Sequence, residues 1–480
     1  MIRPLWDLFA KIALHKKDKL AIIDAITGST LTYSELVEKS SDCANTLAKY
    51  DVSTVAFIGE PVIRTIPFIL ACAKLEICFV PLNENETETT LLDVLSQLPG
   101  PIMIISTKIL KDFQRFDIPS KFKFSGINIY LLDGVHECNN EVPFIITHSS
   151  GSTGKPKAVS FTQTTKLKRT LQSIKLFNIS DHEMVLSASP MHHSLGQRHF
   201  LITLISGATL VKAYPFNVTT WVNTVKDYQI TFTIPVSTHL KILKPTLIDN
   251  PKILSSLRCL VTSSAPAEAE FKNILLNALN CEFWEIYGMT ETACATAVRY
   301  TKGQNTAHLG KSIKGTTLRI NYEDNQNYGE IEIMSDCICD GYWGDMQLWH
   351  KSQTSDGYFR TGDLGTLDSD GQLVYLGRTN ESFESGGLLI FPANIERIFA
   401  EIPEITDCAV FGIPNKIFGH IVCLAYTTNG HICQRDLITH ARRKLPKHHW
   451  PAKLIHYDCF PMLPSGKINK QLLIKHQSNF

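Results

Sequence analysis

The sequence is informative first through what it lacks. No apolar run in its 480 residues approaches the roughly 18 that a membrane-spanning helix needs. The N-terminus shows no signal-peptide pattern of an apolar stretch followed by small residues. Net charge is +1, from 47 basic and 46 acidic residues, so no overall field attracts nucleic acid or membrane. We therefore expect no transmembrane segment, no nucleic-acid partner and a cytoplasmic location.

The sequence also lacks repeats, low-complexity tracts and any paired CxxC pattern. Its thirteen cysteines are scattered, so they form no recognisable zinc site and are expected to be buried free thiols. Hydrophobic residues make up 44% and charged residues 19%, as in ordinary globular proteins. The length allows a large core and more than one domain.

Strand-like and helix-like segments alternate over most of the chain, which predicts an α/β fold with layered, mostly parallel sheets. After Gly329 the pattern changes to antiparallel strands with Gly/Asp turns, which we interpret as a small barrel-like subdomain. We expect a large N-terminal domain at 1–378 and a small, mobile α+β C-terminal domain at 379–480. The strand candidates before Gly329 include PFIITH, MVLSAS, ATLVKAY, ITFTIPV and RCLVTSS.

The stretch SSGSTGKPKAV at 149–159 has the composition of a phosphate-binding loop. It is not the usual nucleotide-binding loop, because Gly151 lies too close to Gly154 and because Lys155 is followed by Pro156. Proline offers neither a hydroxyl for a metal nor an N–H for a phosphate. Composition alone also fits a flexible surface loop.

Six further stretches follow in a set order, and each alone is a weak signal. They are PMHHSLG (190–196), SSAPAE (263–268), EIYGMTET (285–292), YFRTGDLG (358–365), LGRTNESFESGGLLIFPANIE (376–396) and PMLPSGKINK (461–470). Together with 149–159, they closely resemble the adenylate-forming superfamily of acyl- and aryl-CoA synthetases, peptide-synthetase adenylation domains and luciferases. The resemblance covers nearly the whole chain.

This resemblance implies an ATP-dependent enzyme that converts a carboxylic acid to an acyl-adenylate and then transfers the acyl group to a thiol. The implied catalytic residues are Lys467, Thr290, Glu291 and His193, with Glu291 as the magnesium ligand. The implied binding residues for nucleotide and thiol are Ser150, Gly151, Ser152, Thr153, Gly154, Lys157, Ser264, Ala265, Pro266, Tyr287, Gly288, Asp363, Arg378, Gly386 and Gly387.

The family resemblance assigns individual tasks to some of these residues. Lys467 stabilises the charge that builds as the acid attacks the α-phosphorus. Asp363 accepts hydrogen bonds from the ribose hydroxyls. On residue type alone, Lys467 fits a surface lysine, Asp363 a turn aspartate and His193 a core histidine.

The substrate is expected to be a small carboxylic acid without an α-amine. PMHHSLG resembles the form found in CoA synthetases and offers no carboxylate for an ammonium, which would be costly to bury unpaired. The chain departs from the family pattern at Ala158, Ser264, Asn380, Glu384 and Asn394. These departures bear mainly on the second half-reaction.

Three functions stay open at this point. The leading hypothesis is an acyl-CoA ligase that uses ATP, Mg²⁺ and coenzyme A. The second is an enzyme that loads phosphopantetheine on a separate acyl or peptidyl carrier protein. The third is a pseudoenzyme that binds nucleotide. The basic stretch RRKLPKHHWPAK at 442–453 suits either acceptor, with Trp450 placed to stack on adenine, but it also fits a solvated face.

Overall fold

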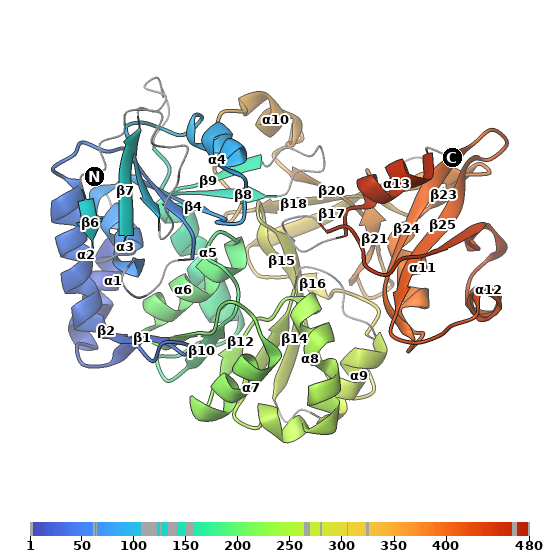
Figure 1. The fold of residues 1–480 in the computed structure, drawn as a ribbon, viewed down its shortest axis with the longest axis horizontal. Coiled ribbons are helices and arrows are strands. Elements are labelled where there is room, and N and C mark those ends of the chain that lie inside the picture. The colour runs from blue at the N-terminus through green and yellow to red at the C-terminus, as the bar shows by residue number, and fades with distance from the viewer. Residues whose placement is uncertain are drawn as a thin grey trace.

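The computed structural model describes all residues except 1–2, 61–62, 64, 107–121, 125–126, 133–141, 150–156, 264–268, 279–280, 305, 323–325, 463–467 and 479–480. Two large sheets with helices between them form most of the molecule, and the C-terminal strands and helices lie at one end (Figure 1). This arrangement confirms the predicted α/β class with a large N-terminal domain and a small C-terminal one.

The first large sheet has nine strands in the order β16-β15-β14-β13-β12-β10-β11-β1-β2. Its strands run parallel from β14 to β1 and antiparallel at both edges. Four of the predicted strands are β10, β11, β12 and β13. The bounds are β1 (Leu20–Asp24), β2 (Thr30–Thr32), β10 (Met184–Ser187), β11 (Thr209–Lys212), β12 (Phe232–Thr233), β13 (Cys259–Thr262), β14 (Glu282–Met289), β15 (Ala293–Tyr300) and β16 (Lys311–Ser312).

The second large sheet has eight strands in the order β19-β9-β8-β4-β3-β5-β7-β6. Every residue of β3, β4 and β5 is buried, as expected for central parallel strands covered on both faces. The bounds are β3 (Thr54–Ile58), β4 (Cys78–Leu82), β5 (Ile102–Ser106), β6 (Phe122–Phe124), β7 (Ile127–Leu132), β8 (Ile145–Ser149), β9 (Lys157–Phe161) and β19 (Gly341–Tyr342).

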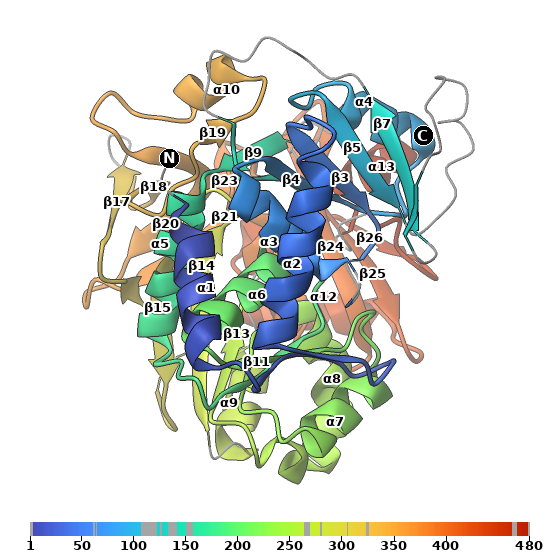
Figure 2. The same cartoon turned by 90° about the vertical axis from the view of Figure 1, so that its left-hand side faces the viewer.

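Five helices fill the layer between the two sheets (Figure 2). One apolar core joins these helices to both sheets, and α3 is buried along most of its length, so its apolar run is a core helix. α4 covers the outer face of the second sheet, and three helices cover that of the first. The bounds are α1 (Pro4–His15), α2 (Tyr33–Leu47), α3 (Ile66–Leu75), α5 (Gln163–Leu176) and α6 (Ser194–Ser206) between the sheets, then α4 (Glu88–Leu95), α7 (Val218–Asp227), α8 (Ser237–Asp249) and α9 (Ala269–Ala278) outside.

Two smaller sheets complete the chain. The first is antiparallel with the order β17-β18-β20-β21, and the second has the order β23-β22-β25-β24 with β26 beside β25. Their strands are β17 (Thr316–Tyr322), β18 (Gly329–Ser335), β20 (Phe359–Leu367), β21 (Leu373–Arg378), β22 (Phe383–Ser385), β23 (Leu388–Ile390), β24 (Ile405–Asn415), β25 (Gly419–Thr428) and β26 (Lys453–His456). The remaining helices are α10 (Met346–Lys351), α11 (Pro392–Phe399), α12 (Gln434–Lys444) and α13 (Lys470–Ser478).

Within the described residues, no helix has the length and apolar character needed to cross a membrane. The cysteines of the described part are unpaired and mostly buried, as expected, although Cys433 and Cys459 are exposed. The parallel strands β10, β13 and β14 end at the same edge of the first sheet. Ligand sites in such sheets lie at the carboxyl ends of the strands. Two of the candidate stretches follow the ends of β10 and β13 in the sequence, and a third, 285–292, includes the end of β14.

Candidate active site

The stretch EIYGMTET forms the end of β14 and a tight turn into β15. A side chain at Gly288 is impossible without rearrangement, because its Cβ would lie 1.7 Å from the carbonyl oxygen of Ala293. Ala293 itself has a φ of 61°, a conformation that a residue with a side chain rarely adopts. The turn is thus specified locally, and it holds Thr290 and Glu291 at the edge of the sheet.

Arg169 on α5 donates hydrogen bonds to the backbone of this turn. Its Nη1 donates to the Thr290 carbonyl at 2.8 Å, its Nη2 donates to the Glu291 carbonyl, and its Nε donates to the Cys337 carbonyl at 2.7 Å. The guanidinium is buried and lies over the Phe161 ring, and burial lowers the pKa of Arg169 to about 10. Arg169 therefore joins the Thr290–Glu291 turn to a segment almost fifty residues later in the chain.

The Glu291 side chain lies between two other segments. It is buried, and its Oε1 accepts a hydrogen bond from the Tyr342 hydroxyl at 3.0 Å. The Nζ of Lys157 lies 5.1 Å from the centre of the Tyr342 ring. Because β9 pairs with β19, the end of the 149–159 stretch is held beside Tyr342. Burial, and then the Glu291 charge, raise the pKa of Tyr342 well above its ordinary value.

Asp363 forms a second buried polar centre. Its Oδ2 accepts from the Tyr287 hydroxyl at 2.8 Å, and its Oδ1 lies 2.9 Å from Nε of Arg378. Asp363 and Arg378 face each other across β20 and β21. Burial and then Asp363 raise the pKa of Tyr287, which keeps its hydroxyl protonated and able to donate. Both Asp363 oxygens thus have a partner, and a carboxylate oxygen can accept more than one hydrogen bond.

His193 stands at the N-terminal end of α6, with its ring 4.5 Å from that of His192. Burial, and then the neighbouring His193, lower the pKa of His192 to about 3. The turn before it is held by Glu60, whose Oε2 accepts from the Met191 amide at 2.8 Å and whose Oε1 pairs with Lys212 at 2.7 Å. Both large sheets therefore support the turn that carries His193.

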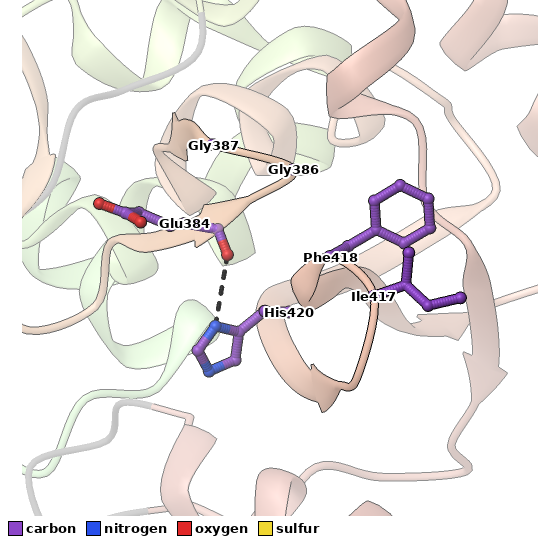
Figure 3. Close-up of a pocket in the computed structure, with 7 residues that line it drawn as sticks. Glu384, Gly386, Gly387, Ile417, Phe418 and His420 are labelled. Atoms are coloured by element: carbon purple, nitrogen blue, oxygen red, sulfur yellow. Dashed lines mark hydrogen bonds between the residues drawn. The ribbon is translucent and has the colours of Figure 1, made fainter.

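Gly386 and Gly387 form the turn between β22 and β23. Their φ angles of 59° and 77° both lie in the left-handed region, which a two-residue hairpin turn of this hand requires. The turn faces the exposed tip of the β24–β25 hairpin, with Phe418 on the other side of the groove (Figure 3). The groove has a volume of about 540 Å³, and His420 is held in it by a contact of 3.3 Å between its Nδ1 and the Glu384 carbonyl.

Lys470 anchors the C-terminal stretch PMLPSGKINK. Its Nζ lies 2.7 Å from Glu381 and 2.8 Å from Glu396, and these two charges raise its pKa against the effect of burial. Glu381 lies three residues after Arg378, in a turn whose Ser382 hydroxyl donates to the Arg378 carbonyl. Lys470 is thereby held beside the Asp363 centre.

Nine of the predicted residues lie outside the described residues, although the strands and turns that flank them are described. Ser149 and Lys157, which flank residues 150–156, are paired across β8 and β9. Met462 and Ile468, which flank residues 463–467, form an isolated β-bridge. The nine residues are Ser150, Gly151, Ser152, Thr153, Gly154, Ser264, Ala265, Pro266 and Lys467.

The sequence matches the family of AMP-binding enzymes over residues 9–343 and the AMP-binding enzyme C-terminal domain over residues 394–467. The chain belongs to the AMP-binding enzyme family. This confirms the resemblance to the adenylate-forming superfamily, and the relatives place this AMP-binding enzyme on its CoA-ligase branch.

Two curated relatives align with nearly the whole AMP-binding enzyme. The indoleacetate–CoA ligase of Aromatoleum aromaticum is 27% identical over 92% of both chains, and the 2-succinylbenzoate–CoA ligase of Oceanobacillus iheyensis is 26% identical over 98% of both. The fold is that of o-succinylbenzoate coenzyme A synthetase from Bacillus subtilis in complex with ATP and magnesium ion. That structure has a TM-score of 0.81 and 21% identity, and the match covers 98% of this chain and 99% of that chain.

Three contributors to the site of this AMP-binding enzyme were not predicted from its sequence. Arg169 lies in a helix with four basic residues, a pattern that normally indicates a solvated face, and Tyr342 and Glu60 lie outside every family-like stretch. Their roles follow from pairings between distant segments. A buried arginine is exceptional enough to be noticed once burial is known, but local sequence does not reveal burial.

Proposed function

We propose that this AMP-binding enzyme activates a small carboxylic acid with ATP, releases pyrophosphate and transfers the acyl group to the thiol of coenzyme A. The observation that carries the proposal is the meeting of Glu291, Tyr342 and Lys157 from three separate segments, above a turn held by Arg169. The names of the two curated relatives, both CoA ligases, support the same reaction.

In the proposed first step, a carboxylate oxygen of the acid attacks the α-phosphorus of ATP, and the bond to pyrophosphate breaks. Lys157 and the hydroxyls of the 149–159 stretch hold the departing phosphates. Thr290 hydrogen-bonds the α-phosphate, and Asp363 accepts from the ribose hydroxyls. Lys467 stabilises the negative charge that develops between attacking oxygen and phosphorus. The product is an acyl-adenylate.

Glu291 fits a magnesium ligand in this proposal. Tyr342 occupies one side of its Oε1, so its carboxylate keeps lone pairs for a cation. The described residues contain no group of three or more His, Cys, Asp or Glu side chains that could hold a metal ion by themselves. Magnesium is commonly held by one or two carboxylates together with substrate phosphates, and it would neutralise charge on the phosphates.

Glu291→Gln should raise the magnesium concentration that gives half-maximal adenylation by about tenfold, because it keeps the shape of the side chain and removes its charge. The measurement is acid-dependent pyrophosphate release during a magnesium titration. Glu330→Gln, which removes a carboxylate on β18, is the matched control. It should leave the half-maximal magnesium concentration unchanged. An unchanged titration in Glu291→Gln would show that this carboxylate is not a metal ligand.

The substrate acid is proposed to lack an α-amine. His193 stands where a carboxylate would be needed, and the nearby Glu60 is already paired with Lys212 at 2.7 Å. Burial raises the pKa of Glu60, and Lys212 works in the opposite direction. A substrate ammonium would compete with Lys212 for this carboxylate, which is unfavourable in a buried setting.

In the proposed second step, the thiol attacks the acyl carbon and AMP leaves. The Gly386–Gly387 turn leaves the groove wall bare on one side, so the slim pantetheine arm can approach the backbone. Coenzyme A and a carrier protein share this arm. Rotation of the C-terminal domain about Asn380 would bring the groove to the adenylate.

The basic stretch at 442–453 bears on the choice between the two acceptors. Ala452 donates to the Val422 carbonyl at 2.8 Å, so the stretch runs beside the start of β25 and near the groove. The guanidinium of Arg442 lies 5.4 Å from the centre of the Trp450 ring, and the Trp450 indole N–H donates to the Leu445 carbonyl at 2.9 Å. Arg442 therefore covers one face of the Trp450 ring. If Trp450 stacks on adenine, it would use its other face, or Arg442 would have to move away.

Changing Arg442 and Arg443 together to alanine should raise the Michaelis constant for coenzyme A several-fold. The Michaelis constant for bare pantetheine should not change, because only coenzyme A carries phosphates that these basic residues could bind. Arg435→Ala, at an exposed position of the same helix, is the control. An equal response of both acceptors, or of neither, would show that the patch does not select coenzyme A and would favour a carrier protein.

A further inference from the structure

The side chain of Gln197 joins separate parts of the N-terminal domain through one amide group. Its Oε1 accepts hydrogen bonds from Nζ of Lys166 on α5 at 2.6 Å and from the Thr147 hydroxyl on β8 at 3.1 Å. Its Nε2 donates to the Met191 carbonyl at 3.0 Å. Gln197 lies on α6, so a single amide links α5, α6, β8 and the turn before α6.

These contacts depend on the amide chemistry of Gln197. The side chains of Gln197, Thr147 and Lys166 are all buried, and a buried polar group without a partner is costly. An amide offers both an oxygen that accepts from two donors and an N–H that donates to a carbonyl. A carboxylate of the same shape would serve Lys166 and Thr147, but it could not donate to Met191.

The turn that Gln197 binds leads directly to His193. The His193 amide donates to the Pro190 carbonyl at 3.1 Å, and the Gln197 backbone amide donates to the His193 carbonyl at 3.3 Å. A Cβ at Gly196 would lie 2.2 Å from the Pro190 carbonyl oxygen, so the start of α6 packs closely against the turn. Because the turn and the helix have little freedom to move separately, displacement of the Gln197 side chain should also move His193.

Gln197 is also linked to the stretch 149–159, which is proposed to hold the phosphates. Thr147 lies on β8, two residues before Ser149, and Ser149 pairs with Lys157 on β9. β8 therefore leads into this stretch and β9 leads out of it. The amide of Gln197 thus stands between the strand that carries the phosphate-binding stretch and the turn that carries His193.

We propose that Gln197 is a positioning residue that holds His193 in place relative to the stretch 149–159, and thereby aligns the acid with the α-phosphorus that it attacks. The inference rests on the proposed function, which gives His193 and this stretch their roles. A misplacement of reacting groups by about 1 Å can cost about a hundredfold in rate. Loss of the alignment should therefore slow turnover more than it weakens the binding of ATP.

Two substitutions break the two links separately. Gln197→Glu keeps an acceptor oxygen and removes the donor to Met191. Thr147→Val keeps the shape of its side chain and removes the hydroxyl that binds Gln197. Each should lower kcat for acid-dependent pyrophosphate release about tenfold, and the dissociation constant of ATP with magnesium should change less than about twofold in titration calorimetry. Gln347→Glu, at an exposed position of α10, is the control and should change neither value.

A double-mutant cycle with His193→Ala separates positioning from a purely structural role. If Gln197 acts through His193, Gln197→Glu should lower kcat by less than about twofold in the His193→Ala background, because the residue that it positions is absent. A purely structural role predicts the same fall in both backgrounds. If the melting temperature shows that Gln197→Glu does not fold, Thr147→Val completes the same cycle.

Four results would each overturn the proposal. They are an unchanged kcat in both single variants, an equal fall in both backgrounds, a loss confined to ATP binding, and a wild-type kcat in His193→Ala.

A readout without turnover separates this inference from the proposed function. In protein with isotope-labelled histidine rings, Thr147→Val should shift the His193 ring signals, which are assigned by their loss in His193→Ala. Thr147→Val introduces no charge, so the shift would report the link through Gln197. This shift without pyrophosphate release for any acid would contradict the ligase function and leave the positioning role in place. Pyrophosphate release without the shift would support the ligase function and overturn the positioning role.

Discussion

Replacing Lys467 by alanine should slow acyl-adenylate formation about a hundredfold, or ~3 kcal/mol, because one preorganised charge is lost from the transition state. Thioester formation from pre-made acyl-adenylate should stay nearly intact, since Lys467 belongs to a domain proposed to rotate away after the first step. The two half-reactions are measured separately, by pyrophosphate release and by consumption of synthetic acyl-adenylate.

The structure supplies a control for this experiment. Lys470, three residues later, pairs with Glu381 and Glu396. Lys470→Ala therefore tests the loss of these two ion pairs while the Lys467 side chain is kept. Lys475→Ala, at an exposed position of α13, tests simple loss of charge and should be neutral. An equal loss in both half-reactions of Lys467→Ala would contradict its assignment to the first step.

Arg169→Met should have the second largest effect, with adenylation reduced roughly a hundredfold and the protein destabilised by about 3 kcal/mol. Three backbone carbonyls lose their charged donor, and two of them belong to the turn that holds Thr290 and Glu291. Because the turn should then sample other positions, the magnesium requirement should rise as well. Melting temperature, pyrophosphate release and a magnesium titration measure the three parts.

A purely structural role of Arg169 predicts a different pattern. It would lower the melting temperature and the amount of active enzyme and leave the magnesium dependence of the remaining activity unchanged. Lys168→Ala removes the neighbouring exposed charge and is the matched control. Added ethylguanidinium should restore part of the activity of Arg169→Ala, since it can refill the space and donate to the same carbonyls.

The main features of the fold could be predicted from the sequence because its signals are local. The alternating runs at 184–189, 208–214 and 258–264 became β10, β11 and β13. Thr32 and Glu35 form the capping box that begins α2, as their spacing allows. The order of strands within each sheet was not predictable in this way, because pairings such as that of β9 with β19 join residues far apart in sequence.

For the candidate site, too, some residues could be selected from local sequence, and their partners could not. Glu291 and Asp363 were selected from compact stretches through the family resemblance, and both are buried with polar partners in the structure. The partners that orient them come from elsewhere: Tyr342 binds Glu291, and Arg169 binds the backbone beneath it. Tyr287 was predicted only as a binding residue, and its hydroxyl is found to donate to Asp363. Burial, which is a tertiary property, turns such residues from surface side chains into parts of a site.

The proposed chemistry is tested most directly by acid-dependent exchange of labelled pyrophosphate into ATP, measured with the wild-type protein, magnesium and a panel of mono- and dicarboxylic acids. We predict exchange that requires both magnesium and an acid, and that falls about a hundredfold in Lys467→Ala. Binding of ATP without exchange for any acid in the panel would contradict the proposal and indicate a nucleotide-binding protein without ligase activity.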